Sequence, residues 1–153
     1  MPKLLILAVC EKAIIDRAQV PSLIGILQGI NVQLTGEPMP ERAITQMRWA
    51  VFTSWQHELQ EVGREFTQFM EVITPSGEAF VRAETKFKTL DAQDLQSRIG
   101  YDLVSIPISE VGFFKVHIWL DGDTENKAEY RFYLKHVPPP ETATPSLISD
   151  SVG

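Results

Sequence analysis

An alternation of apolar and polar residues over positions 112–136 predicts a β-hairpin. Every second residue is apolar from 114 to 120, and the same period of two returns from 130 to 134. The polar loop 121–127 separates the two stretches and contains a glycine, which is typical of a hairpin turn. An isolated hairpin is only marginally stable in water, so we expect further strands to cover its apolar side.

The remaining chain supplies these strands. Turn signals divide it into extended segments, and little of it has a helical pattern. The sequence therefore predicts an all-β fold, an antiparallel β-sandwich of about eight strands with at most one or two short helices. Besides the two arms of the hairpin, the expected strands cover residues 4–10, 22–34, 44–55, 66–74, 78–90 and 99–108.

The segment Ser22–Leu34 fits two interpretations. As a strand it places three isoleucines, a valine and a leucine on one face, and β-branched residues suit a pleated surface. As a helix it also has an apolar stripe, but Gly25 and Gly29 would each cost such a helix about 1 kcal/mol. We therefore expect a strand, and a mixed fold with a helix at this segment is the alternative.

Three connections carry recognisable turn chemistry. Residues 56–65 are polar and predict a turn that could contain one helical turn. Pro75-Ser76-Gly77 predicts a tight turn, because proline presets φ and glycine tolerates positive φ. Asp91 could cap a short helix over residues 92–98, since aspartate accepts hydrogen bonds from the free amides at a helix start.

Length and composition indicate one domain. The chain has 153 residues, of which 44% are hydrophobic and 22% charged, so a core of ordinary size is expected over residues 1–137. Three consecutive prolines begin the segment 138–153, which we expect to be a solvated, flexible tail. A polyproline segment that binds a partner is the alternative for this tail.

Charge and cysteine content limit the compartment and the partners. The net charge of −6 disfavours binding to nucleic acid or to an anionic membrane, which both attract basic surfaces. The lone Cys10 excludes an internal disulfide and suits a reducing compartment. The apolar run 4–10 resembles a secretion signal, but it has no clear cleavage site and is too short to span a bilayer. We therefore expect a buried strand there and a cytoplasmic protein.

Several short stretches together resemble a family of small bacterial proteins that share a domain of unknown function. The resemblance covers about residues 2–136, and its motifs are strand and turn patterns found in many β-sandwiches. It implies a bacterial cytoplasmic protein and assigns no catalytic residue. The stretches are Cys10-Glu11-Lys12-Ala13-Ile14-Ile15-Asp16, Pro21-Ser22-Leu23-Ile24, Pro75-Ser76-Gly77, Gly112-Phe113-Phe114-Lys115-Val116 and Leu120-Asp121-Gly122.

The search for reactive groups finds no catalytic residue and no cofactor motif. The three histidines lack zinc-ligand spacing, and no serine-nucleophile or phosphate-loop motif occurs. A Ser-His-acid set could assemble from distant positions, but the sequence favours none. Calcium is the better metal hypothesis, since Asp121, Asp123 and Glu125 share one loop, although this loop departs from the EF-hand pattern.

The aromatic residues are the remaining functional candidates. They lie either in the core, under a second covering layer, or on an exposed face that could bind something. We expect a non-enzymatic interaction module that contacts a protein partner, or another copy of itself, through this face or a free strand edge. A small-ligand or carbohydrate-binding sandwich is the first alternative, and an enzyme of unrecognised type is the second. The candidate binding residues are Trp49, Trp55, Phe113, His117, Trp119 and Tyr133.

Overall fold

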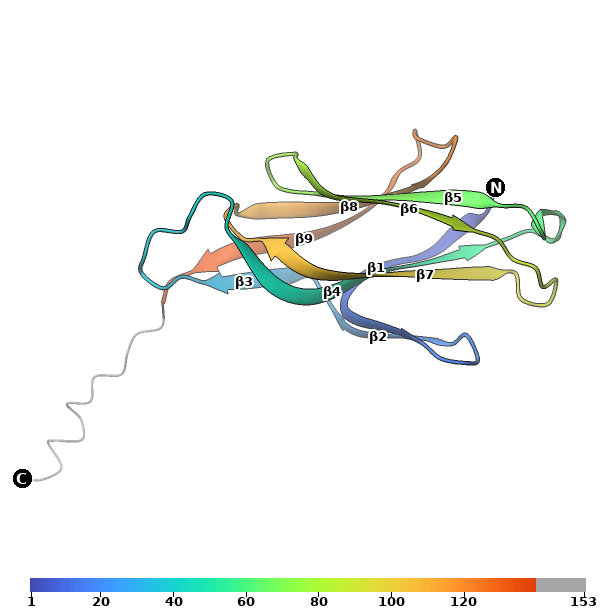
Figure 1. Cartoon of the computed structure of the whole chain (residues 1–153), viewed down its shortest axis with the longest axis horizontal. Helices are drawn as coiled ribbons and strands as arrows, with labels where there is room; N and C mark the ends of the chain where they lie inside the picture. Colours follow the sequence, from blue (N-terminus) through green and yellow to red (C-terminus); the bar gives the residue numbers. More distant parts are fainter. Residues whose placement is uncertain (140–153) are drawn as a thin grey trace, which may run out of the picture.

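Two packed β-sheets form the molecule (Figure 1), and the computed structural model describes residues 1–139. In these residues, four strands pair in the order β2-β1-β4-β7 and five in the order β3-β9-β8-β5-β6. The predicted all-β sandwich is therefore confirmed, with nine strands where about eight were expected. The strands are β1 (Lys3–Ile15), β2 (Pro21–Ile26), β3 (Gly29–Gln33), β4 (Ile44–Gln56), β5 (Phe66–Ile73), β6 (Ala79–Phe87), β7 (Gln96–Pro107), β8 (Gly112–Leu120) and β9 (Ala128–Val137).

The predicted hairpin consists of β8 and β9. The two strands pair antiparallel, and Phe114 lies opposite Phe132. Their rings stack with centroids 5.2 Å apart, and the Trp49 ring of the facing sheet meets Phe132 at 5.7 Å. All three side chains are buried, and burying a large apolar side chain contributes about 1.5–3 kcal/mol. The inner side of the hairpin is thus the centre of the core.

A polar network crosses the interior between the sheets. The Oε1 atom of Gln68, on β5, accepts hydrogen bonds from Thr53 Oγ1 at 2.8 Å and Trp55 Nε1 at 2.5 Å, both on β4. Its Nε2 atom donates to the Tyr101 hydroxyl of β7 at 2.9 Å, which lies 2.7 Å from Thr85 Oγ1 of β6. Because buried polar atoms are costly without partners, this network fixes how the two sheets face each other.

The segment 22–34 is not one strand, which corrects the prediction. It forms β2 and β3, which belong to different sheets, and Leu27 and Gln28 make the transition. The Leu27 N–H donates to Val9 O at 2.8 Å, whereas Gln28 O accepts from the Tyr133 N–H at 3.2 Å. Each residue thus bonds to a different sheet. β3 then runs parallel to β9, whereas the other strand pairs are antiparallel.

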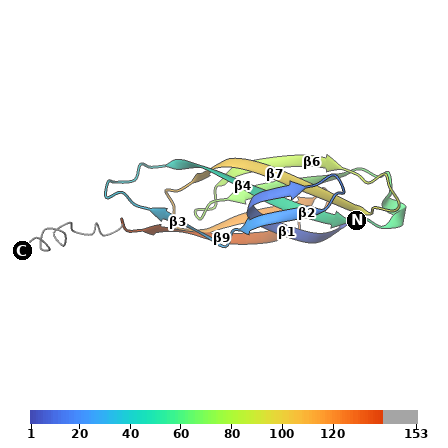
Figure 2. The same cartoon turned by 90° about the horizontal axis from the view of Figure 1, so that it is seen from below.

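The end of β1 and β2 form an arm that bends beneath the four-stranded sheet (Figures 1 and 2). The turn at the tip is closed by the Gln19 N–H, which donates to Asp16 O at 3.0 Å. Ala50 and Phe52 of β4 are also buried although they alternate with the residues of the core. Cys10, at the bend, is also buried, and this burial raises the pKa of its thiol.

The predicted turns are confirmed and the predicted helix is wrong. Residues Leu59–Glu61 form a single 3₁₀ turn, and Gly77 closes the tight turn after Pro75 with φ of 94°. Residues 92–98 are not helical, because Asp91 Oδ1 accepts from the Gln93 N–H at 2.8 Å in a local turn. β7 then starts at Gln96.

No helical segment among residues 1–139 has the length and apolar character that a membrane crossing requires. The expected tail begins with Pro138 and Pro139, and the rest of it, residues 140–153, lies outside the described part of the chain.

Replacing Gln68 with leucine should lower the free energy of unfolding by about 2–4 kcal/mol, because it leaves several buried donors without an acceptor. Equilibrium urea unfolding measures this loss as a lower transition midpoint. Gln33→Leu, an exposed glutamine in β3, is the matched control and should change stability by less than about 0.5 kcal/mol. Equal midpoints for Gln68→Leu and wild type would contradict the proposed importance of the network.

Candidate functional site

The outer side of the five-stranded sheet gathers four of the predicted binding residues. Phe113, His117 and Trp119 point to the same side of β8, and Tyr133 of β9 lies directly opposite Phe113. Phe113 is 50% exposed and Tyr133 is 38% exposed. We call this surface the outer sheet face. It comprises the outward side chains of β5, β6, β8 and β9, together with Lys127 at the start of β9.

One end of the outer sheet face carries an aromatic pair with a cation. Phe69 of β5 lies opposite Trp119, and their rings stack with centroids 5.6 Å apart. The ammonium of Lys127 lies over the Trp119 ring, 4.1 Å from its centroid. Lys127 and Phe69 come from the two neighbours of β8, so the indole is flanked on both sides. Trp119 is half-buried, and a cation over such an indole contributes on the order of 1 kcal/mol.

The other end carries a second aromatic pair. The rings of Phe113 and Tyr133 meet edge to face with centroids 5.0 Å apart. The neighbour of Tyr133 on β3 is Gly29, which has no side chain. The Tyr133 ring therefore stays open on the β3 side.

Charged side chains lie between the aromatic pairs. Arg82 of β6 pairs with Glu71 of β5 at 3.3 Å. Glu129 of β9 contacts His117 Nε2 at 3.0 Å and Arg131 Nε at 2.5 Å. The hydrogen bonds from His117 and Arg131 lower the pKa of the Glu129 carboxyl. Two of the acidic groups of this face, Glu71 and Glu129, are thus already engaged.

The outer sheet face has the opposite charge to the whole chain. It carries six Lys or Arg residues and three Glu residues, which gives a local formal charge of +3, whereas the whole chain carries −6. Positive charge is therefore concentrated on this side of the molecule. The residues counted are Arg82, Lys86, Lys115, Lys127, Arg131, Lys135, Glu71, Glu84 and Glu129.

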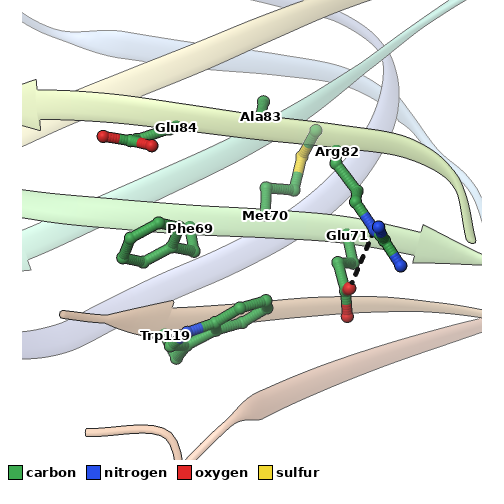
Figure 3. A pocket seen from close by; sticks show the side chains of 7 residues that line it. All are labelled: Phe69, Met70, Glu71, Arg82, Ala83, Glu84 and Trp119. Carbon is green, nitrogen blue, oxygen red and sulfur yellow. Dashed lines mark ion pairs between the residues drawn. The ribbon is translucent and has the colours of Figure 1, made fainter. Parts of the chain in front are cut away.

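A pocket of 280 Å³ opens on this face between β5, β6 and β8 (Figure 3). Phe69 and Trp119 lie side by side at one side of it, and the Arg82–Glu71 ion pair lies at another. Met70 and Ala83 complete it from β5 and β6. The pocket offers an aromatic wall, an ion pair and few free polar groups.

Phe69, Glu71, Arg82 and Lys127 belong to this face but were absent from the sequence-based candidates. The signal for Phe69 is its place in β5, where it alternates with the buried residues Gln68 and Met70. That alternation predicts an outward Phe69. That β5 lies next to β8 depends on the order of strands in the sheet, and the residue pattern within a single strand does not reveal this order.

Trp49 and Trp55 do not line this face, which corrects their assignment. They are 1% and 5% exposed, and both point into the sandwich from β4. Their indole N–H groups donate to Ser105 O at 2.9 Å and to Gln68 Oε1 at 2.5 Å. Trp49 and Trp55 are therefore core residues, as the alternative interpretation of the sequence proposed.

The hypothesis of a calcium site at Asp121, Asp123 and Glu125 is not supported. Within residues 1–139, no three His, Cys, Asp or Glu side chains gather closely enough to hold a metal ion. The three acidic residues follow one another around the β8–β9 loop. Asp123 Oδ1 instead accepts a hydrogen bond from Asn126 Nδ2 at 2.8 Å, which holds the turn.

A buried Ser-His pair lies at one end of the sandwich. Ser97 Oγ is 2.7 Å from His57 Nε2, and His57 is only 2% exposed. The rings of Phe66 and Phe87 each lie 5.7 Å from the imidazole. In the described part of the chain Nδ1 has no hydrogen-bond partner, so no acid orients the ring as in a catalytic triad. Burial lowers the pKa of His57.

Glu61 lies near this histidine and is also 2% exposed. Its Oε1 accepts from the Glu58 N–H at 2.8 Å, and its Oε2 lies 3.1 Å from the Met1 ammonium. Burial acts to raise the pKa of Glu61, but the Glu58 hydrogen bond and the ammonium outweigh it, so the pKa is lowered. Glu61 therefore stabilises the chain end and the 3₁₀ turn.

A scan of the chain against protein-family models finds no match, and a search of curated proteins also finds none. The interpretation of the outer sheet face therefore rests on its geometry and charge.

Trp119 should account for most of the tryptophan fluorescence that iodide quenches, because it lies on the surface and the other two tryptophans are buried. The Trp119→Phe variant should lose the quenchable component, and the emission that remains should resist iodide. Chain unfolded in guanidinium is the control, since all tryptophans are accessible there. Unchanged quenching in Trp119→Phe would show that a core tryptophan is accessible.

Stability should fall as the pH drops below about 6.5, because the unfolded chain then binds a proton that buried His57 resists. One such group gives a slope of at most about 1.4 kcal/mol per pH unit. The His57→Gln variant should reduce this slope between about pH 5 and pH 6.5 in urea unfolding. His117→Gln is the control for loss of a histidine, and an equal reduction in both variants would contradict the assignment.

Proposed function

We propose that this chain is a non-enzymatic binding module that holds a protein partner with an acidic surface on its outer sheet face. The observation that carries the proposal is the positive charge of a face that also carries two aromatic pairs, one exposed and one half-buried, on an otherwise acidic molecule. Aromatic and arginine side chains are enriched at the energetic centres of protein interfaces.

The strongest electrostatic argument is the pairing of Lys115 with Arg131. These residues lie directly opposite each other on β8 and β9, and like charges in that position are unfavourable. Arg131 has Glu129 as a partner, whereas Lys115 makes no ion pair with any residue of 1–139. A carboxylate from a bound partner would relieve the repulsion, so this part of the face favours an acidic ligand.

The dimensions of the face suit a protein more than a small molecule. Phe113 and Trp119 are six residues apart on one strand, which corresponds to about 20 Å. An interface of standard size buries about 800 Å² on each partner, and a face of this length across four strands provides a surface of that order. The 280 Å³ pocket at one end could take a single side chain of the partner.

Carbohydrate binding is the weaker alternative. A sugar ring usually packs against an open aromatic face, whereas the Trp119 indole is flanked by Phe69 and Lys127. Nucleic acid is also disfavoured, because a net charge of −6 opposes a polyanion away from this one face. Neither alternative explains the two separated aromatic pairs as well as a protein partner does.

The cytoplasm is the proposed compartment, and its support is the lone buried Cys10. The bacterial setting rests on the family resemblance alone.

Reversing the positive pair should abolish partner capture. Tagged wild-type protein and a Lys115→Glu/Arg131→Glu variant are used to recover partners from the cells that naturally make the protein. The wild type should retain an acidic protein, and the variant should retain at least tenfold less of it. The amount that the wild type retains should fall as the salt concentration rises, because salt screens exposed charges.

The matched control is Lys12→Glu/Arg48→Glu, which makes the same charge change at exposed residues of β1 and β4. It should retain the partner at the wild-type level. Recovery of the same proteins by wild type and both variants would count against the outer sheet face. Retention of a sugar polymer or of nucleic acid in place of an acidic protein would select the corresponding alternative.

A further inference from the structure

β6 is one of the two edge strands of the five-stranded sheet and borders the molecule along one side (Figure 2). It pairs with β5 on one side only, so the backbone groups on its other side face outward. A free edge of this kind can pair with an extended segment of another chain. A register irregularity beyond Val72 ends the regular pairing with β5, so the regular part of the edge is Val81–Phe87.

Charges of opposite sign alternate along this edge. Arg82 and Glu84 are two residues apart and point to the same side of the sheet, with Ala83 between them (Figure 3). The Arg82 side chain is 75% exposed, and Glu84 is also exposed. Two copies of an edge with this pattern can therefore be complementary to each other.

The geometry points to a homodimer in which the β6 strands of two copies pair antiparallel around a two-fold axis at Ala83. In this register Arg82 lies opposite the second copy's Glu84, and symmetry repeats the contact. On the inner side Val81 lies opposite the second copy's Thr85, and the two Ala83 residues face each other. The pairing joins the two five-stranded sheets into one. It uses the free backbone edge of β6, with Arg82 and Glu84 at the margin of the outer sheet face, and a second copy as the partner, so it goes beyond the proposed function.

The charges also exclude the neighbouring registers. Moving the axis to Glu84 would place the two Glu84 residues opposite each other and Arg82 opposite Lys86. Moving it to Arg82 would place the two Arg82 residues opposite each other. Like charges directly opposite in an antiparallel pair are unfavourable, and a register shifted by one residue would exchange the faces. Ala83 is therefore the centre that this edge favours.

The dimer should be visible by sedimentation velocity over a wide concentration range, as growth from 17.3 kDa towards twice that mass. Glu84→Arg and Arg82→Glu should each weaken it roughly tenfold, because each turns two attractive contacts into repulsive ones. The double exchange Arg82→Glu/Glu84→Arg restores both contacts in reverse and should recover most of the association. Glu125→Arg, in the β8–β9 loop, is the matched control and should leave the association unchanged.

A cysteine at the two-fold axis tests the register independently. Two Ala83→Cys chains should form an intermolecular disulfide on mild oxidation, because opposite Cα atoms in an antiparallel pair lie about 4.5–5.5 Å apart. Lys86→Cys is the control, since its copies would be about 20 Å apart in this register. The native Cys10 is fully buried and does not interfere.

Cross-linking at position 83 but not at 86, together with recovery in the double exchange, would support the dimer. A mass that stays at 17.3 kDa at every concentration, with no cross-link at 83, would overturn it. An association that is as strong in Arg82→Glu and in Glu84→Arg as in the wild type would overturn it as well, because another surface would then form the dimer. Circular dichroism of each variant verifies that the β-structure is intact.

Discussion

The hydrogen bonds of the Gln68 side chain are the constraint on which the sandwich depends. Its amide lies between the sheets, accepts from β4 and donates to β7, so it connects three strands through one side chain. A shift of one residue in any of these strands would turn the partner outward and leave buried polar atoms unpaired. The network therefore specifies one register among the many that apolar packing alone would allow.

That register decides which side chains are available for binding. Because β5 is held with Gln68 and Met70 inward, Phe69 and Glu71 must point outward beside the β8 residues. The outer sheet face is thus a consequence of the core, and its aromatic and charged rows inherit their spacing from the strands beneath. A surface held by strands in this way needs little rearrangement on binding, which lowers the entropic cost of association.

Much of the fold could be predicted from the chain, because period-two alternation and turn residues are local signals. The same alternation places Phe113, His117, Trp119 and Tyr133 on the side of the sheet opposite the core, but it does not show whether a second layer covers that side. The division of 22–34 between two sheets could not be predicted, since it depends on which distant strands bond to Leu27 and Gln28. Trp49 and Trp55 alternate just as the outer aromatics do, and only the stacking of the second sheet buries them.

The parallel pair of β3 and β9 has a consequence for biosynthesis. The Tyr130 hydroxyl bonds to the carbonyl of Leu27, a contact between residues 103 positions apart. On a ribosome, β3 must therefore wait for its neighbour until β9 has emerged about 100 residues later, and contacts of such long sequence separation form slowly. During that interval the nascent chain exposes an incomplete sheet, whose unpaired edge can associate with other chains.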